Sequence, residues 1–387
     1  MKKAALQNLG CKVNAYETEG MEQMLIGDGY EIVDFHEKAD VYVINTCSVT
    51  IIAAGCYVQT SQEQAIADDT IDIILGNNKK GKLIEQLHAF LQDKEKKEEL
   101  IIISEETIVE DTHIHNSMEH TRAFIKVQDG CNQFCSYCII PYARGRVRSR
   151  EWKDIHEEIS ILAKKGFQEV VITGIHLSSY GVDCGDSLLN LIQNVAKIDG
   201  ISRIRLGSLE PKIITEEFVR ALASITKICP HFHLSLQSGS DTTLKRMRRT
   251  YTTQEYLEGC ALLRKYFKHP ALTTDVIVGF PQETEEEFEQ TKEFLSKVDF
   301  YEVHLFKYSK RKGTVAADMD GQIEESEKTR RSAKLAPIVT QGKKRFMDAY
   351  LNQSVEVLME EKIKVNDEYF FVGFTKEYVK VGIKTDK

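Results

Sequence analysis

Six short β-rich segments alternate with helical segments between residues 123 and 308, and this alternation limits the fold more than any other feature of the chain. Apolar side chains at helical spacing, such as Ile155, Ile159 and Leu162, lie in the intervals. Strands that alternate with helices form parallel sheets with right-handed crossovers, so six such units predict an open, partial (β/α)6 barrel. The segments are AFIKVQ (123–128), EVVITGI (169–175), SRIRLGS (202–208), HFHLSLQ (231–237), LTTDVIVGF (272–280) and YEVHLFKY (301–308).

Shorter patterns flank the barrel segments. Before them, AALQNLG (4–10), VYVINTC (41–47), IIAAGCYV (51–58) and IDIILGN (71–77) predict a small parallel α/β domain. After them, a long charged helix over about residues 324–350 leads to three alternating segments, which predict a small C-terminal β-barrel. The expected domains of this α/β protein are residues 1–117, 118–335 and 336–387.

The composition indicates the compartment and the kind of chemistry to look for. Hydrophobic residues make up 42% and charged residues 28% of the chain, and no run reaches the roughly 18 apolar residues of a membrane-spanning helix. The first residues turn polar too soon for a signal-peptide core, so we expect a cytoplasmic protein. In a reducing compartment, the nine cysteines favour metal ligands over disulfides. Because the formal charge is −8, contact with nucleic acid requires local basic patches.

A CxxxCxxC motif lies at the carboxyl end of the first barrel segment. Three thiolates in one tight loop, from Cys131, Cys135 and Cys138, can hold three irons of a 4Fe-4S cluster and leave the fourth iron open. A structural zinc ion would need a fourth ligand, from Asp129 or a distant histidine. Chemistry in parallel sheets lies at the carboxyl ends of the strands, so the open cluster is the favoured interpretation.

Three further cysteines follow three different strands of the N-terminal pattern. Cys11 follows the first strand, Cys47 the second and Cys56 the third, so they can converge at one edge of a parallel sheet. That arrangement suits a second cluster with an open iron. The alternative is that each is a small buried packing residue, as cysteine often is.

The first cysteine motif resembles the signature of the radical S-adenosylmethionine (SAM) superfamily, CxxxCx-aromatic-C, with Tyr137 as the aromatic residue. The resemblance implies that SAM binds the open iron and is cleaved to a 5′-deoxyadenosyl radical, chemistry that belongs to the cofactors. Glycines and short polar residues after strands are also ordinary turn residues. Positions that match the SAM pocket of the superfamily are Gly174, Gln237, Ser238, Gly279 and Glu283, and Arg150 is a further candidate for contact with SAM.

Nearly the whole chain resembles the radical SAM methylthiotransferases, which have an N-terminal cluster domain, a radical SAM domain and a C-terminal TRAM module. The resemblance implies two 4Fe-4S clusters, two SAM molecules per turnover, and an electron donor and a sulfur donor that no motif identifies. NTCSVT, CIIPYARGRVRSR and LKRMRRTYT are most similar to the branch that converts N6-threonylcarbamoyladenosine in the tRNA anticodon loop to its 2-methylthio derivative. The alternatives are isopentenyladenosine in tRNA, a ribosomal-protein aspartate, or a non-catalytic iron-sulfur protein that binds RNA or senses redox state.

The chain departs from that family at one position. The family has a helical, partly basic segment between the second and third N-terminal cysteines, whereas Thr50 here runs directly into Ile51. Parallel neighbours need a crossover of about a dozen residues. The sequence therefore predicts that a segment is missing, or that Cys56 fails to meet Cys11 and Cys47.

Arg144, Arg146 and Arg148 follow the cysteine loop in alternation, which places them on one side of an extended segment. Guanidinium groups bind phosphates and carboxylates bidentately, so we expect this row to contact the tRNA backbone or the threonyl carboxylate. A solvated or ion-paired loop is the alternative. The C-terminal segment has aromatic residues beside lysines, which is typical of a small RNA-binding module.

Overall fold

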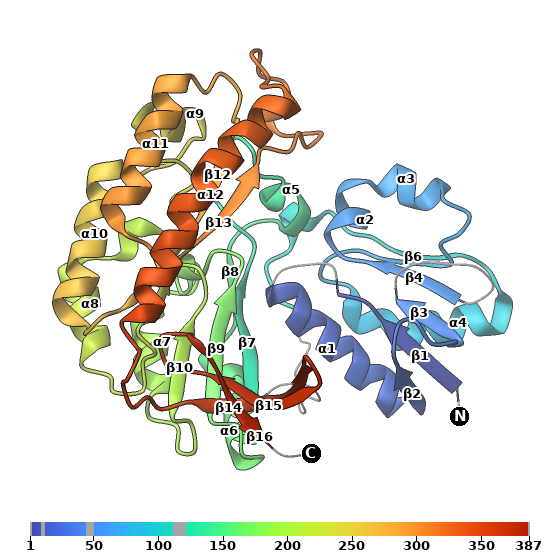
Figure 1. The fold of residues 1–387 in the computed structure, drawn as a ribbon. Coiled ribbons are helices and arrows are strands. Elements are labelled where there is room, and N and C mark those ends of the chain that lie inside the picture. The colour runs from blue at the N-terminus through green and yellow to red at the C-terminus, as the bar shows by residue number, and fades with distance from the viewer. Residues whose placement is uncertain (1, 9–11, 44–49, 111–120, 386–387) are drawn as a thin grey trace.

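The computed structural model describes residues 2–8, 12–43, 50–110 and 121–385. Figure 1 shows an N-terminal α/β part beside a larger barrel part, with a small C-terminal sheet below the barrel. Within these ranges, no helix is both long and apolar enough to cross a membrane.

The N-terminal part is a six-stranded parallel sheet with the strand order β2-β1-β3-β4-β5-β6. β1 therefore lies between β2 and β3, and the order reverses there as in doubly wound folds. Apolar side chains from both layers, including Leu25, Ile52 and Leu87, form its core. Its elements are β1 (Lys2–Leu6), α1 (Lys12–Gly27), β2 (Tyr30–Val33), β3 (Val41–Val43), β4 (Thr50–Ala54), α2 (Cys56–Thr60), α3 (Gln62–Ala67), β5 (Ile73–Leu75), α4 (Leu83–Asp93) and β6 (Lys97–Glu99).

The neighbouring strands β3 and β4 are parallel although few residues connect them. Val41 pairs with Thr50 and Val43 with Ile52. The sequence predicts a crossover of about a dozen residues for such a pair. Only residues 44–49 separate the two strands, and they lie outside the described ranges.

The central part is the predicted partial barrel of six parallel strands. The four-stranded sheet β10-β9-β7-β8 and the three-stranded sheet β11-β12-β13 are joined by isolated bridges, Ile204 to Ile228 and Leu209 to Leu234. β8 (Arg148–Ser149) runs antiparallel to β7. The parallel strands are β7 (Arg122–Asp129), β9 (Glu169–Gly174), β10 (Arg203–Leu206), β11 (His231–His233), β12 (Ala271–Val278) and β13 (Glu302–Lys307).

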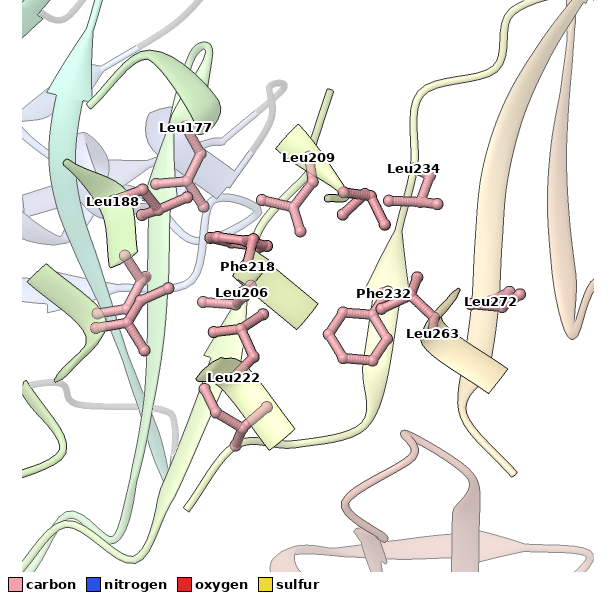
Figure 2. Packing of buried hydrophobic residues seen from close by; sticks show 14 of the residues in the cluster. Leu177, Leu188, Leu206, Leu209, Phe218, Leu222, Phe232, Leu234, Leu263 and Leu272 are labelled. Carbon is pink, nitrogen blue, oxygen red and sulfur yellow. The ribbon is translucent and has the colours of Figure 1, made fainter. Parts of the chain in front are cut away.

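Amphipathic helices cover the convex side of this barrel (Figure 1). Figure 2 shows how Leu206, Phe218, Leu222 and Phe232 pack between strands and helices in the main core. Their burial stabilises the sheet and fixes where its carboxyl ends lie. These helices are α6 (Trp152–Lys164), α7 (Leu188–Val195), α8 (Glu216–Ala223), α9 (Asp241–Arg246), α10 (Thr253–Tyr266), α11 (Glu285–Val298) and α12 (Glu325–Asp348). The short helix α5 (Ile140–Arg144) lies instead on the side of the N-terminal part, where it contacts α2 (Figure 1).

The C-terminal part is an antiparallel sheet of β14 (Leu358–Val365), β15 (Glu368–Phe374) and β16 (Lys380–Thr385). The sequence predicts a small barrel here, and the described strands form an open three-stranded sheet. It packs against the amino ends of the barrel strands, where Arg122 pairs with Glu360 at 2.8 Å. Arg203 also donates to the carbonyl oxygen of Phe374 at 3.0 Å.

Candidate functional site

The cysteine loop between β7 and α5 begins with a glycine in the left-handed region. Gly130 has φ +73°, and a Cβ at this position would lie 1.8 Å from the carbonyl oxygen of Arg146. Only glycine permits this approach. The backbone N–H of Cys131 then donates to the carbonyl of Gly145 at 3.1 Å, which ties the start of the loop to the segment after α5.

Segments that follow three other barrel strands hold the middle of the loop. Ser136 donates its backbone N–H to the carbonyl of Met247 at 3.1 Å and accepts from the N–H of Ala316 at 2.7 Å. The ring of Tyr137 packs edge-on against Phe280 with the centroids 6.4 Å apart. The loop is therefore positioned by the barrel and not by its own hydrogen bonds alone.

The spread of the thiols distinguishes a cluster from a single ion. Cys131 and Cys135 are buried and Cys138 is partly buried. Within the described ranges, the one group of His, Cys, Asp or Glu whose ligand atoms all lie within 4.8 Å of one another is elsewhere, so at least two of these three sulfurs lie more than 4.8 Å apart. Thiolates around one zinc ion are about 3.8 Å apart. The loop therefore fits an iron-sulfur cluster, in which each thiolate binds a separate iron, better than zinc.

The thiols need help to ionise. Burial raises the pKa of Cys131 and of Cys138 to about 11, although backbone N–H groups partly oppose it. Iron ligation requires the thiolate form, so loading of the loop must release protons. Arg249 donates from Nη1 to the Sγ of Cys135 at 3.1 Å and supplies a positive charge that favours the thiolate.

Glu210 and His176 extend this polar surrounding. The sequence places both after barrel strands, and Arg249 in a basic run, but it does not assign any of the three to the cofactor site. The Oε2 of Glu210 accepts from Nη2 of Arg249 at 2.7 Å and lies 3.6 Å from Nε2 of His176. Glu210 Oε1 and His176 Nε2 are buried without a hydrogen-bond partner in the described structure. Since buried polar atoms are nearly always satisfied, these two fit a polar ligand such as the amino group of SAM. The available signal was the position of Glu210 shortly after a barrel strand.

The residues predicted to form the SAM pocket lie at the carboxyl ends of barrel strands. Gly174 ends β9, and a Cβ there would lie 2.8 Å from Oε1 of Gln128. That glutamine donates to the carbonyl of Gly130 at 2.7 Å, so Gly174 leaves room for a brace of the cysteine loop. Gln237 has φ +70° and is followed by the fully buried Ser238, so both shape the turn after β11.

Glu283 braces the turn after β12. Its Oε2 accepts from the N–H of Gly279 at 2.7 Å and from Nη1 of Arg331 at 2.5 Å. Burial raises the pKa of Glu283, opposed by the hydrogen bonds from Gly279 and Arg331. Gly279 has φ +70° and would clash with the side chain of Lys328 if it carried a Cβ. The carboxylate of Glu283 therefore holds the turn after β12 in place through its bonds to Gly279 and Arg331.

The arginine row does not lie on one exposed side, which corrects the sequence-based expectation. Arg146 is exposed, with its guanidinium carbon 4.6 Å from the centroid of Phe134. Arg144 and Arg148 are only 1% and 2% exposed and cannot contact tRNA. Arg150 is also buried, and its Nη1 bonds a carboxylate of α6 at 2.7 Å, which leaves it no access to SAM. The cause is the local secondary structure. Arg144 is the last residue of α5, which packs inward, so the extended segment in which alternate residues share a side begins only after Arg144.

Arg144 belongs to a buried group of charges between α1 and the barrel. Its Nη1 donates to Glu17 Oε1 at 2.9 Å and to Asp129 Oδ2 at 3.2 Å. Burial alone raises the pKa of Glu17, but Arg144 and Lys126 outweigh it and hold that pKa well below its usual value. This buried ion cluster contains the cations Lys80, Lys126, Arg144 and Arg148 and the carboxylates Glu17 and Asp129.

Cys56 begins α2 at the carboxyl end of β4 and lines a cavity of about 520 Å³. The cavity lies where the strand order reverses between β1 and β3, the position at which doubly wound sheets bind ligands. Asn77 donates from Nδ2 to the Sγ of Cys56 at 3.4 Å and to the carbonyl of Ala143 at 2.7 Å. Cys11 and Cys47, the predicted partners of Cys56, lie outside the described residues.

A partial barrel with a three-thiol loop at the end of its first strand defines the radical SAM class of iron-sulfur enzymes, which uses SAM and a 4Fe-4S cluster. Residues 125–295 match the model described as the Radical SAM superfamily, and residues 3–54 match that of the uncharacterized protein family UPF0004. The chain belongs to the radical SAM methylthiotransferase family, as its full-length relatives show.

Three relatives establish this membership. The chain is 38% identical to the threonylcarbamoyladenosine tRNA methylthiotransferase MtaB of Bacillus subtilis, over 99% of this chain and 91% of that protein. It is 37% identical to the protein of the same name from Aquifex aeolicus, over 98% of each chain. It is 35% identical to the tRNA-2-methylthio-N(6)-dimethylallyladenosine synthase of Acetivibrio thermocellus, over 98% of this chain and 85% of that protein. The first alignment spans 409 positions, more than the 387 residues here, so the Bacillus protein has residues that this chain lacks.

Solved structures support the fold alone. The radical SAM methyltransferase TsrM of Kitasatospora setae matches with a TM-score of 0.59 at 14% identity, over 82% of this chain and 77% of that one. The cobalamin-dependent SAM radical enzyme OxsB matches with a TM-score of 0.54 at 11% identity, over 88% of this chain and 56% of that one.

Proposed function

We propose that the protein converts N6-threonylcarbamoyladenosine in the tRNA anticodon loop to its 2-methylthio derivative. The relatives from Bacillus and Aquifex that carry this name match at 38% and 37% identity over nearly full chains. The dimethylallyladenosine synthase of Acetivibrio matches at 35% identity, which makes the dimethylallyl nucleoside the second candidate substrate.

The observation that carries the proposal is the direct link between the two cysteine sites. Asn77 bonds both the thiol of Cys56 and the carbonyl of Ala143, and Ala143 lies in the helix that follows the three-thiol loop. A sulfur-handling group at Cys56 and a radical-forming group at the loop would therefore sit on adjoining elements. Methylthio transfer requires that both sites act on the same substrate atom.

We assign a second 4Fe-4S cluster to Cys11, Cys47 and Cys56. The buried ion cluster supports this assignment because it has four cations and two carboxylates close to Cys56. An uncompensated excess of buried positive charge is costly. A thiolate-bound cluster is anionic and would offset that excess.

The chain's own residues bind and orient the cofactors in this proposal. When bound, SAM and the two clusters supply the radical that removes a hydrogen atom and the sulfur that replaces it. Glu210 and His176 would hold the amino group of SAM, and Arg249, which contacts both Cys135 and Glu210, would fix the position of Glu210. The loop residues predicted from the family shape the rest of the pocket, namely Tyr137, Gly174, Gln237, Ser238, Gly279 and Glu283.

The tRNA is expected to enter between the two α/β parts. Phe134, Tyr142 and Arg146 line a cleft of about 580 Å³ together with residues 100–104. The rings of Phe134 and Tyr142 meet edge-on at 5.7 Å, and Tyr142 is half exposed. Exposed aromatic rings beside an arginine are a common platform for unstacked bases.

The test is anaerobic reconstitution followed by reaction with reductant, SAM and tRNA carrying either threonylcarbamoyladenosine or dimethylallyladenosine. Mass spectrometry of the nucleosides should show the 2-methylthio product from the threonylcarbamoyl tRNA. Product from the dimethylallyl tRNA alone would assign the protein to the second candidate.

Cysteine variants separate the two cluster sites. Cys56→Ala should lower the iron content from about eight to about four per chain and abolish methylthiolation while SAM cleavage remains. Cys184→Ala is the matched control, because this thiol is exposed and belongs to neither set of cysteines, and should change neither quantity. Four irons in the parent protein would contradict the second cluster.

A further inference from the structure

A group of two histidines and one aspartate lies on neighbouring strands of the barrel and includes none of the cysteines. His233 is in β11, Asp275 in β12 and His304 in β13. One ligand atom from each lies within 4.8 Å of the other two, and no other group of His, Cys, Asp or Glu in the described ranges meets this condition. Neither the family assignment nor the proposed function uses these residues.

Strand register brings the three side chains together on the inner face of the sheet. Asp275 pairs with His304, and His233 pairs with Thr273. Alternate residues of β12, including Val276, face the helices in the main core, so Asp275 points to the opposite face. Ile277 shares that face and, like Tyr137 of the cysteine loop, packs against the buried cluster that contains Phe280.

The three side chains offer a nitrogen, nitrogen and oxygen donor set. Nδ1 of His233 bonds the hydroxyl of Thr273 at 3.0 Å, which leaves Nε2 directed at Asp275 Oδ2, 3.4 Å away. The ring of His304 stacks on that of His233 with the centroids 5.9 Å apart and an angle of 27°. A hydrogen bond to the remote ring nitrogen is the usual support of a histidine that binds a metal.

The surroundings of the group suit an ion. Asp275 forms no ion pair with lysine or arginine in the part of the chain that the structure describes, and its ion-pair contact is with His233. The side chain of Asp275 is 30% exposed and that of His233 13%, so an ion can reach the group from the interior of the barrel. Ligands of one ion at about 2.1 Å lie at most about 4 Å apart, so small side-chain rotations complete the site.

We propose that His233, Asp275 and His304 bind one divalent transition-metal ion such as zinc or iron(II). Two imidazoles and one carboxylate are the donor set of zinc sites with an open position and of non-haem iron sites. Three protein ligands leave coordination positions open toward the inside of the barrel. The ion there takes water or an oxygen atom of a molecule bound in the barrel.

The test uses the fully reconstituted protein, in which iron and sulfide occupy the cysteines. Zinc is added in equilibrium dialysis, and zinc, iron and sulfide are counted per chain. We expect one zinc in addition to the full iron content, and X-ray absorption at the zinc edge should show nitrogen and oxygen ligands without sulfur. His233→Ala and Asp275→Asn should each abolish this zinc, whereas His156→Ala, a histidine of α6 outside the group, should retain it.

A more conservative variant tests the metal site even if replacement of His233 or Asp275 disturbs the folding of the sheet. Thr273→Val keeps the volume but removes the bond to Nδ1 of His233, and it should weaken zinc binding about 10- to 100-fold with unchanged iron content. Sulfur in the zinc shell, or equal zinc binding by the parent and the His233→Ala variant, would overturn the proposal. So would absence of zinc binding accompanied by weaker tRNA binding in the variants, because the residues would then contact the substrate directly. None of these readouts depends on which nucleoside the enzyme modifies.

Discussion

Replacing Arg144 with methionine should destabilise the protein strongly without involving tRNA. The guanidinium is 1% exposed and bonds Glu17 at 2.9 and 3.0 Å and Asp129 at 3.2 Å. Breaking a buried ion pair costs about 3 to 5 kcal/mol because the partner charge stays buried. Lys126 still pairs with both carboxylates at 2.8 Å, so we expect the lower end, about 3 kcal/mol. For a folding unit of this size the shift is about 1.3 °C per kcal/mol, which corresponds to a decrease in Tm of about 4 °C.

The matched control is Arg146→Met, two residues along the same segment. Its guanidinium is exposed and contacts the ring of Phe134, a contact worth about 0.5 to 1 kcal/mol, so its Tm should fall by no more than about 1 °C. Circular dichroism melting of both reconstituted proteins measures the difference, and a double variant with Glu17→Gln should lose less than the sum of the single losses. The reasoning is refuted if Arg144→Met melts like the parent and loses only affinity for tRNA.

Three further predictions concern the cysteine loop and the buried charges. Gly130→Ala should remove about four irons per chain, because its Cβ would lie 1.8 Å from a carbonyl oxygen, whereas Gly166→Ala, with φ +94° and open space, should keep them. Arg249→Met removes the hydrogen bond to the Sγ of Cys135 and should lower the reduction potential of the loop's cluster by about 60 mV in a titration followed by electron paramagnetic resonance; an unchanged potential would contradict this role. Burial alone raises the pKa of Asp129, but neighbouring cations hold it at about 2, below the unfolded value of about 3.9. Its stabilisation is therefore present above pH 4 and lost between about pH 4 and 2, and the Asp129→Asn variant should lack that part of the acid-unfolding slope.

The sequence predicts the barrel well because its strands are buried on one or both faces and its helices are amphipathic. The segment 272–280 reads as a strand and forms β12. The segment 231–237 reads equally well, yet β11 ends at His233. Beyond His233, Leu234 and Gln237 each form only an isolated bridge. The positive φ of Gln237 turns the chain, and this turn is set by tertiary contacts. β2, β6 and β8 were not predicted; they have four, three and two residues, too few to show a clear periodicity.

The candidate site also has one part that the sequence predicts and one part that it does not. The three-thiol loop is visible in the sequence because its ligands are close together and their spacing is restricted by the cluster. The burial of Arg144 is not visible, because its partner Glu17 is 127 residues away and belongs to another part of the fold. Alternation along an extended segment says which side chains share a face but not whether another domain covers that face.

We expect this long-range pairing to make the N-terminal part and the barrel one folding unit. α1 supplies Glu17, whereas β7 and the segment after it supply Lys126, Asp129 and Arg144. A barrel expressed from residue 121 onward would lack Glu17 and keep Asp129 as the one described carboxylate of the buried ion cluster against three cations. Such a fragment should then expose these charges or unfold locally around β7, and its three-thiol loop should bind iron poorly. If the fragment instead held about four irons as tightly as the full chain, the barrel would be independent of its neighbour, and the buried charges would contribute little to the site.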